Sequence, residues 1–220
     1  LIRFGSSGLA GVWAEENTRE SIYNAFRRKE TFGTSGPRIK VRFFAGYNFE
    51  NLDLNDRDLI QEAYSANIPM GGDIIQEKGK NPRFLVWAIS DPLGAPLQRV
   101  QIIKGWLADG EQREKVFDVA CSDGQRVNPL NHRCPDNGAK VNLEDCSISR
   151  EKGSAEIKTF WEDPEFRSDQ QVFYYARVLE NPTCRWSTWD AVRAEEKPRS
   201  DIPVTIQERA WSSPIWFKVD

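Results

Sequence analysis

Hydrophobic and polar residues alternate with a period of two along most of the chain after residue 38. In residues 38–43, Arg38, Lys40 and Arg42 alternate with Ile39, Val41 and Phe43, which is typical of a half-buried strand. Further strands, rich in Val, Ile, Phe, Tyr and Trp, are predicted at residues 83–90, 99–106, 113–120, 155–161, 172–180, 204–209 and 214–219. Strands without intervening helices predict a mainly β fold, an Ig-like two-sheet antiparallel sandwich.

Apolar residues recur with helical spacing only before residue 38 and in one short stretch after it. Residues 18–30 carry apolar side chains at three- and four-residue spacing, and Asn17 with Glu20 forms a capping-box pattern. The sequence TFGTSGP at residues 31–37 should end this helix, and residues 56–66 predict a second one. The pattern therefore divides the chain into a short N-terminal helical segment, residues 1–37, and a sandwich, residues 38–220.

The composition of the chain argues against two classes of partner, nucleic acids and membranes. The chain has 220 residues, with 30 basic and 33 acidic side chains and a net charge of -3. Because no block of Lys and Arg stands out, nucleic-acid binding is not expected. The longest apolar run, residues 84–89, is far shorter than the roughly 20 residues of a membrane span.

The search for catalytic chemistry is mainly negative. His132 is the only histidine, so His-pair metal sites and histidine-based hydrolase centres are not expected within this chain. Phosphate-binding glycine motifs and nucleophile elbows do not occur either. We therefore predict no catalytic residue, no metal ligand and no cofactor in these 220 residues.

The four cysteines predict two disulfides. Cys121, Cys134, Cys146 and Cys184 are even in number, and none forms a C-x-x-C pair. Four cysteines allow three pairings, and all three fit a sandwich. Pairing Cys121 with Cys134 and Cys146 with Cys184 closes the smallest product of loop lengths, which favours it by only a few tenths of a kcal/mol. Disulfides indicate an extracytoplasmic location, periplasmic or secreted.

Eight tryptophans are many for this length. Four of them fall in predicted strands and should belong to the core: Trp87, Trp106, Trp161 and Trp216. Three others, Trp186, Trp189 and Trp211, fall beside loops, where exposed rings could stack on a ligand.

Several long motifs resemble a bacterial family catalogued as Domain of Unknown Function 3604. They are GVWAEENTRE (11–20), RRKETF (27–32), TSGPR (34–38), PMGGD (69–73), RVQIIKGW (99–106), FYYARV (173–178), RWSTWD (185–190) and QERAWSSPIW (207–216). The resemblance covers essentially the whole chain. It implies that residues 1–37 are the last part of a metallohydrolase-type barrel of the polymerase-and-histidinol-phosphatase kind, in which His, Asp and Glu hold the metal ions that activate water.

The resemblance leads to a functional expectation. The chain opens with Leu1 and its only methionine is Met70, so we expect a fragment of a longer protein. We interpret it as the non-catalytic C-terminal domain of a metal-dependent hydrolase of a phosphoester, ester or amide, with the divalent metal in the preceding barrel. The alternative is a carbohydrate- or protein-binding sandwich module.

Either function would use residues of the quoted motifs. The candidate ligand or interface residues are Trp13, Glu15, Arg19, Arg185, Trp186, Trp189, Asp190 and Trp211. The expected partner is the chain's own N-terminal barrel. An apolar patch around Leu9, Val12, Trp13 and Phe26 should be exposed on the chain alone and could support a homodimer.

Overall fold

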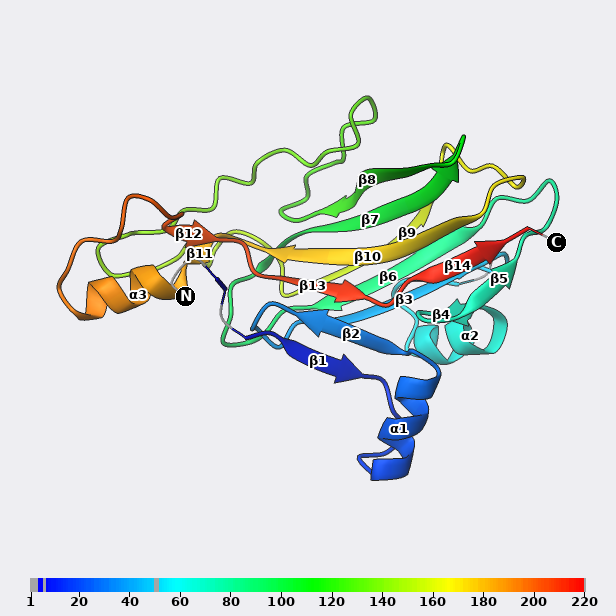
Figure 1. Ribbon diagram of the computed structural model, residues 1–220, viewed down its shortest axis with the longest axis horizontal. Helices are drawn as coiled ribbons and strands as arrows, with labels where there is room; N and C mark the ends of the chain where they lie inside the picture. Colours follow the sequence, from blue (N-terminus) through cyan, green and yellow to red (C-terminus); the bar gives the residue numbers. More distant parts are fainter. Residues whose placement is uncertain (1–3, 6, 50–51, 220) are drawn as a thin grey trace.

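The computed structural model of the protein, which describes residues 4, 5, 7–49 and 52–219, contains two β-sheets packed face to face (Figure 1). In the larger sheet, β1 (Leu9–Val12) pairs with β2 (Thr31–Thr34), and β2 pairs with β13 (Arg209–Ser212). The central strand β10 (Val172–Glu180) pairs on one edge with β13 and with β14 (Ile215–Lys218), and β14 also pairs with β5 (Asp73–Ile75). On its other edge β10 pairs with β7 (Leu97–Ala108), which pairs with β8 (Glu111–Cys121). The smaller sheet is β4 (Ile68–Pro69), β3 (Lys40–Gly46), β6 (Arg83–Ile89) and β9 (Glu156–Glu162).

Strand β10 is the centre of the larger sheet. Its alternating pattern places Val172, Tyr174, Ala176 and Val178 in the core between the sheets. One edge pairs with β7 along the whole strand, and the other edge pairs with β13 and β14, which follow each other along it. All pairings in this sheet are antiparallel except that of β5 with β14.

The smaller sheet has a core on each face. Val41 and Phe43 of β3 face the larger sheet, whereas Phe44 points the other way. There it packs with Leu85 of β6 and with Leu59 of helix α2 (Leu59–Ala66). The structure thus confirms the predicted mainly β sandwich and its second helix, which begins at Leu59 rather than at residue 56.

A tight hairpin turn joins β7 to β8. Asp109 and Gly110 both have positive φ angles, 53° and 77°, as a two-residue hairpin turn requires. Of the strands predicted, those from residue 83 to residue 180 lie within a few residues of the observed bounds.

The N-terminal segment departs from its prediction in two ways. Helix α1 spans Arg19–Arg27, and its N-cap is Thr18, whose hydroxyl accepts a hydrogen bond from the Ser21 backbone N–H, rather than Asn17. Residues 31–34 were expected to be loop but form β2, which pairs with β13. The glycines of this stretch suggested a turn, whereas pairing with β13 holds it extended. The larger sheet therefore continues across the boundary placed at residue 38.

Two further elements near the C-terminus differ from the prediction. The strand expected at residues 204–209 is divided into β12 (Thr205–Ile206), which pairs with β11 (Thr183–Cys184), and β13. Residues around Trp186 were expected to be loop but form helix α3 (Trp186–Arg193). This helix has no side-chain N-cap bond and is rich in Trp, Ser and Thr, so its sequence lacks a helical signal.

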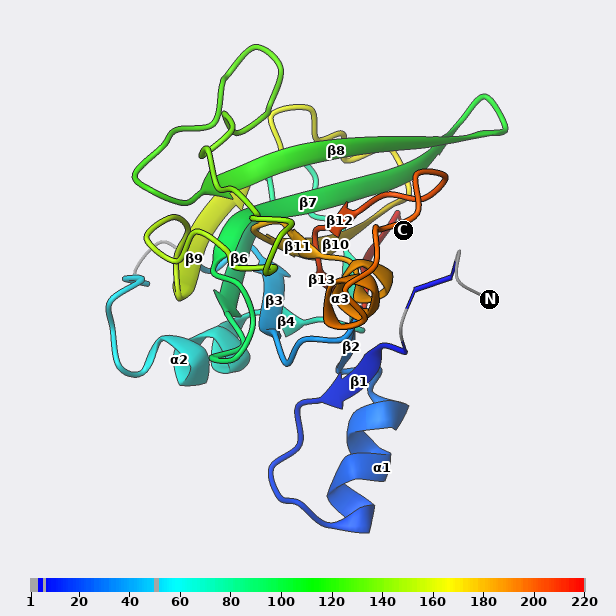
Figure 2. The same ribbon diagram turned by 90° about the vertical axis from the view of Figure 1, so that its left-hand side faces the viewer.

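Helix α1 projects away from the sheets, whereas α3 lies beside β11 and β12 at one end of the sandwich (Figure 2). The predicted exposed patch is present in part. Leu9 and Phe26 are about half exposed, at 45% and 52%, but Val12 and Trp13 are half-buried. In the described part of the chain, none of the helices combines the length and apolar character needed to cross a membrane.

Candidate functional site

A cavity of about 580 Å³ lies where the long loop after β8 meets the end of β10, β11 and helix α3. This volume falls in the range of small-molecule sites. Its walls come from five parts of the chain: Pro37; Leu93, Gly94 and Ala95; Asp145, Cys146, Ser147, Ile148 and Arg150; Glu180, Thr183, Cys184, Trp186 and Trp189; and Glu208.

Two disulfides fix the long loop that forms one wall. Cys121 is bonded to Cys134, and Cys146 is bonded to Cys184, each with a Cα–Cα distance of 5.6 Å. Two bridges were predicted, and this is the pairing that loop length slightly favoured. The second bridge joins the loop to β11, so Cys146 and its neighbours are held at the cavity.

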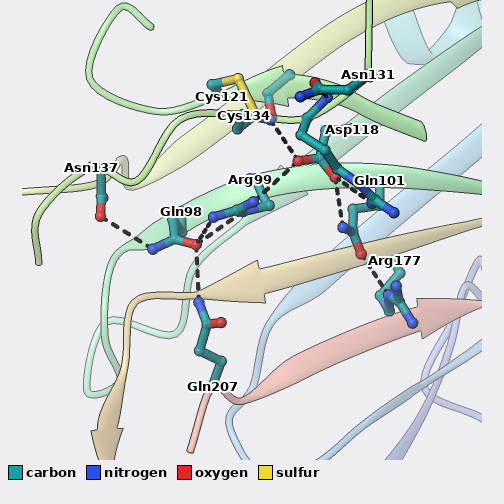
Figure 3. Close-up of polar contacts among 12 residues, drawn as sticks. Gln98, Arg99, Gln101, Asp118, Cys121, Asn131, Cys134, Asn137, Arg177 and Gln207 are labelled. Carbon is teal, nitrogen blue, oxygen red and sulfur yellow. Dashed lines mark hydrogen bonds and ion pairs between the residues drawn. A yellow bond between two sulfur atoms is a disulfide. The ribbon is translucent and has the colours of Figure 1, made fainter. Parts of the chain in front are cut away.

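A buried polar network holds the base of the same loop on the larger sheet (Figure 3). Asp118 of β8 accepts hydrogen bonds from Gln101 Nε2 at 2.6 Å and from the Cys134 backbone N–H at 2.7 Å. Its other partners are the guanidinium groups of Arg99, at 3.1 Å, and of Arg133, at 3.5 Å. Gln101 in turn accepts a bond from Arg177 Nε at 2.7 Å.

Amide side chains extend this network toward the cavity. Gln98 Nε2 donates to Asn137 Oδ1 at 3.1 Å, and Asn137 Nδ2 donates to Asn181 Oδ1 at 2.9 Å. Gln207 Nε2 donates to Gln98 Oε1 and also to the Glu180 backbone carbonyl, both at 3.0 Å. Figure 3 shows Gln98 between Asn137 and Gln207. The backbone that carries Glu180 is therefore held by side chains from several strands and from the loop.

Glu180 is the most buried charged group of the cavity, with 1% of its surface exposed. Its Oε2 accepts a long hydrogen bond of 3.4 Å from the Ala95 backbone N–H, and its Oε1 has no hydrogen-bond partner. Burial, with smaller contributions from the nearby charges of Asp91 and Glu208, raises the pKa of this carboxyl to about 8 against the lowering effect of the Ala95 hydrogen bond. At neutral pH the group therefore holds a proton that an ordinary glutamate would have lost.

Gly94 allows the loop before β7 to approach this carboxyl closely. A Cβ atom at position 94 would lie 2.9 Å from Glu180 Oε1, closer than real Cβ contacts. A side chain here would therefore push against the oxygen that has no partner.

The sequence RWSTWD, singled out above, contributes the aromatic wall. Trp186 and Trp189 lie on α3 and both line the cavity, and Trp189 is 37% exposed. Arg185 is buried before the helix: its guanidinium donates to the Phe4 carbonyl at 2.5 Å and to Ser187 Oγ at 2.6 Å. Trp186 Nε1 also donates to the Phe4 carbonyl, at 3.0 Å. Asp190, on the same helix, is exposed.

The other tryptophans are distributed differently from the prediction. Trp211 lies in β13 rather than beside a loop, and the cavity lining does not include it. Trp216 was expected in the core but is 44% exposed, because in β14 it alternates with the buried Ile215 and Phe217. Trp161 does pack in the core, against Phe84 at 5.5 Å between ring centroids.

The remaining predicted residues lie on the N-terminal side, away from α3. Trp13 Nε1 donates to the Val41 carbonyl at 2.8 Å, and the Arg42 guanidinium lies 3.6 Å from the Trp13 ring centroid. Glu15 lines a second cavity, of about 570 Å³, together with Trp13 and Arg42. Arg19 begins α1 and lies beside the exposed Phe26.

Arg42 connects this group to a buried carboxyl. Its Nη1 donates to Tyr64 Oη at 2.8 Å, and the Tyr64 hydroxyl donates to Glu30. Burial, followed by the bond to Glu30, raises the pKa of Tyr64 to about 12. The motif residues thus form two groups, one around Trp13 and one around Trp186.

Sequence reasoning missed Glu180 and Glu208. A signal for Glu180 was present: it occupies the next inward-facing position of β10 after Val178, where a charged residue breaks the apolar series. Glu208 gave no such signal. Among residues 4, 5, 7–49 and 52–219, no three His, Cys, Asp or Glu side chains are grouped so that they could hold a metal ion.

A sequence model of the family described as "Protein of unknown function (DUF3604)" matches residues 1–219. Because the match covers nearly the whole chain, the protein belongs to this family. No curated protein and no solved structure matches the chain.

Proposed function

We propose that this chain is a non-catalytic accessory domain of a metal-dependent hydrolase that acts on a phosphoester, ester or amide. The divalent metal would be held by a catalytic barrel that precedes these residues, as the resemblance of residues 1–37 to the end of such a barrel implies. The two disulfides are consistent with an extracytoplasmic location.

The observation that carries this proposal is the concentration of exposed apolar side chains in the N-terminal segment. Tyr23 is 60% exposed on helix α1, in addition to Leu9 and Phe26. Exposed aromatic and aliphatic groups gathered on one projecting segment are typical of a surface that another domain covers. Arg185 and Trp186, which bind the Phe4 carbonyl, would fix the direction from which the chain enters the sandwich.

The test compares the 220-residue chain with a longer protein that includes its native upstream region. Metal binding and hydrolysis of aryl phosphoester, ester and anilide substrates are measured for both. We expect metal-dependent hydrolysis only from the longer protein. Hydrolysis by the 220-residue chain at the rate of the longer protein would contradict the proposal.

The contact itself is tested in the longer protein with Phe26→Asp. This change should make the N-terminal segment sensitive to limited proteolysis, because a charge in a covered apolar contact is strongly unfavourable. Lys29→Asp, a change at an exposed position of the same segment, is the matched control and should leave the proteolysis pattern unchanged. Equal resistance of the wild type and of Phe26→Asp would contradict a domain contact here. Sedimentation of the 220-residue chain distinguishes such a contact from a homodimer.

A second candidate is the carbohydrate- or protein-binding module. One observation favours it: Trp186 and Trp189 line the same cavity. Trp211 is not part of that lining, so the three rings do not form the extended strip that stacks along a polymer. The test is titration of the chain with soluble glycans, observed through tryptophan fluorescence, and saturable quenching would support this candidate.

A further inference from the structure

The cavity beside α3 contains an unsatisfied buried group whose role is independent of the proposed accessory function. Glu180 presents a carboxyl oxygen that is buried, has no hydrogen-bond partner and belongs to a residue of the cavity lining. Leaving such an oxygen unsatisfied costs roughly 1–3 kcal/mol, more for a charged group. Folded proteins rarely keep such an atom without a partner, which can be a ligand, an ion or an ordered water.

The charges around Glu180 indicate the sign of the ligand. Asp145 and Glu208 also line the cavity, and Asp91 lies close enough to raise the pKa of Glu180. Arg150 is the one basic residue of the lining, and its guanidinium donates to the Gly94 carbonyl at 3.4 Å. In the part of the chain that the structure describes, no ion pair involves Glu180. The cavity is therefore acidic, and its innermost carboxyl lacks a counter-ion.

The other acidic groups near Glu180 have hydrogen-bond partners within the chain. Asp91 accepts hydrogen bonds from the backbone N–H groups of Arg38 and Leu93, at 2.7 and 2.9 Å. Glu208 accepts one from Ser35 Oγ at 2.5 Å. Their bonds hold them in place, so they contribute negative potential while Glu180 offers the free acceptor.

The walls indicate the rest of the ligand. Trp186 and Trp189 supply aromatic surface, and Ile148 and Leu93 supply aliphatic surface. Aromatic faces attract cations and also pack against apolar groups. A ligand that suits both the walls and the acidic end carries its positive charge on an apolar body.

We propose that this cavity binds a small organic cation whose ammonium or guanidinium N–H donates to Glu180 Oε1 and whose apolar body packs against Trp186 and Trp189. The cation supplies both the hydrogen bond and the positive charge that the site lacks. A neutral sugar supplies only the hydrogen bond, and an anion is repelled by Glu208 and Asp145.

The experiment titrates the chain with 2-phenylethylammonium and with 2-phenylethanol, which share an apolar body and differ in charge. Binding is followed by calorimetry and by the indole N–H signals of Trp186 and Trp189 in NMR spectra. We expect one site that prefers the ammonium by at least about tenfold. The same two indole signals should shift on binding.

Three variants test the role of the carboxyl. Glu180→Gln keeps the shape but cannot release a proton and become charged when the ammonium binds, and Gly94→Ala adds a Cβ against Oε1, so both should weaken ammonium binding about tenfold or more. Glu196→Gln, an exposed position after α3, is the matched control and should bind as the wild type does. Circular dichroism melting of each variant separates lost binding from lost folding, and Gly94→Ala answers the question if Glu180→Gln does not fold.

Four outcomes would overturn the proposal. They are equal binding of 2-phenylethanol, unchanged ammonium binding by Glu180→Gln or by Gly94→Ala, stronger binding of methyl glucoside than of the ammonium, and no binding of the ammonium up to millimolar concentration. The last outcome would assign the free acceptor of Glu180 to a bound water.

Discussion

The sandwich buries two carboxyl groups to the same degree, and their surroundings are opposite. Asp163, after β9, and Glu180, at the end of β10, are each only 1% exposed. Asp163 accepts hydrogen bonds from Lys104 Nζ at 2.5 Å, Tyr174 Oη at 2.6 Å and the Glu165 backbone N–H at 2.8 Å. Glu180 accepts one long bond through one oxygen.

This comparison distinguishes a buried carboxyl group with a structural role from one that is available to a ligand. Lys104 of β7 supplies a counter-ion for Asp163 and also donates to the Glu165 carbonyl at 2.8 Å. Burial, followed by the charge of Asp163, raises the pKa of the Tyr174 hydroxyl, so that hydroxyl remains a donor. The Asp163 group is thus complete within the chain. The Glu180 group is incomplete, and we assign it to a ligand.

Breaking the complete group should have the largest effect. Lys104→Met leaves Asp163 buried without its counter-ion, which should lower the free energy of unfolding by about 3–5 kcal/mol. Urea denaturation measures it. Adding Asp163→Leu to the same chain should recover part of the loss, because no uncompensated charge then remains. A loss below about 1 kcal/mol for Lys104→Met would show that the pair is not essential to the core.

Removal of either disulfide should give the next loss of stability, and comparing the two removals separates the cavity from the rest of the loop. Replacing Cys146 and Cys184 by Ser opens a loop with a sequence separation of 38, and replacing Cys121 and Cys134 opens one of 13. Chain entropy predicts losses of about 4 and about 3 kcal/mol respectively.

Only the Cys146–Cys184 bridge lines the cavity, so only its removal should also weaken ammonium binding. Thermal unfolding and the calorimetric titration measure the two effects on the same samples. Equal loss of binding in both double variants would contradict the placement of the site.

Much of the fold could be predicted because its strands obey local rules. The alternation of β3 and β10 identifies their inward faces, and Asp109-Gly110 identifies a hairpin turn. Elements such as α3 and β2 could not be predicted, because tertiary contacts rather than propensity hold them in place: the Cys146–Cys184 bridge beside α3 and the pairing with β13 for β2.

The candidate site was predictable only in part, for the same reason. The RWSTWD motif identified Trp186 and Trp189, and the cysteines identified the covalent frame. The approach of Glu208 and of Gly94 to Glu180 joins positions far apart in the sequence, and no local pattern reports such a contact.

A further effect is a pH dependence of stability that the Glu180 carboxyl should produce. The folded chain holds the Glu180 proton up to a pKa of about 8, whereas the unfolded chain releases it near 4.5. The free energy of unfolding should therefore fall as the pH rises from 4.5 to 8, with no contribution from this group to the slope below or above that window.

Glu180→Gln removes this dependence because it resembles the protonated form at every pH. Near the upper end of the window it should exceed the wild type in stability by more than about 1 kcal/mol, and at the lower end the two should agree. Urea denaturation across the window measures the difference, with Glu196→Gln as control. Parallel pH profiles for the wild type and Glu180→Gln would contradict an unpaired carboxyl.

The most direct test of the central claim is a carbon-13 NMR titration of the Glu180 side-chain carboxyl, assigned by its absence from the Glu180→Gln spectrum. The account predicts a midpoint near pH 8 in the free protein and a lower midpoint in saturating 2-phenylethylammonium. A midpoint near the ordinary value of 4.5, unchanged by the ammonium, would contradict it.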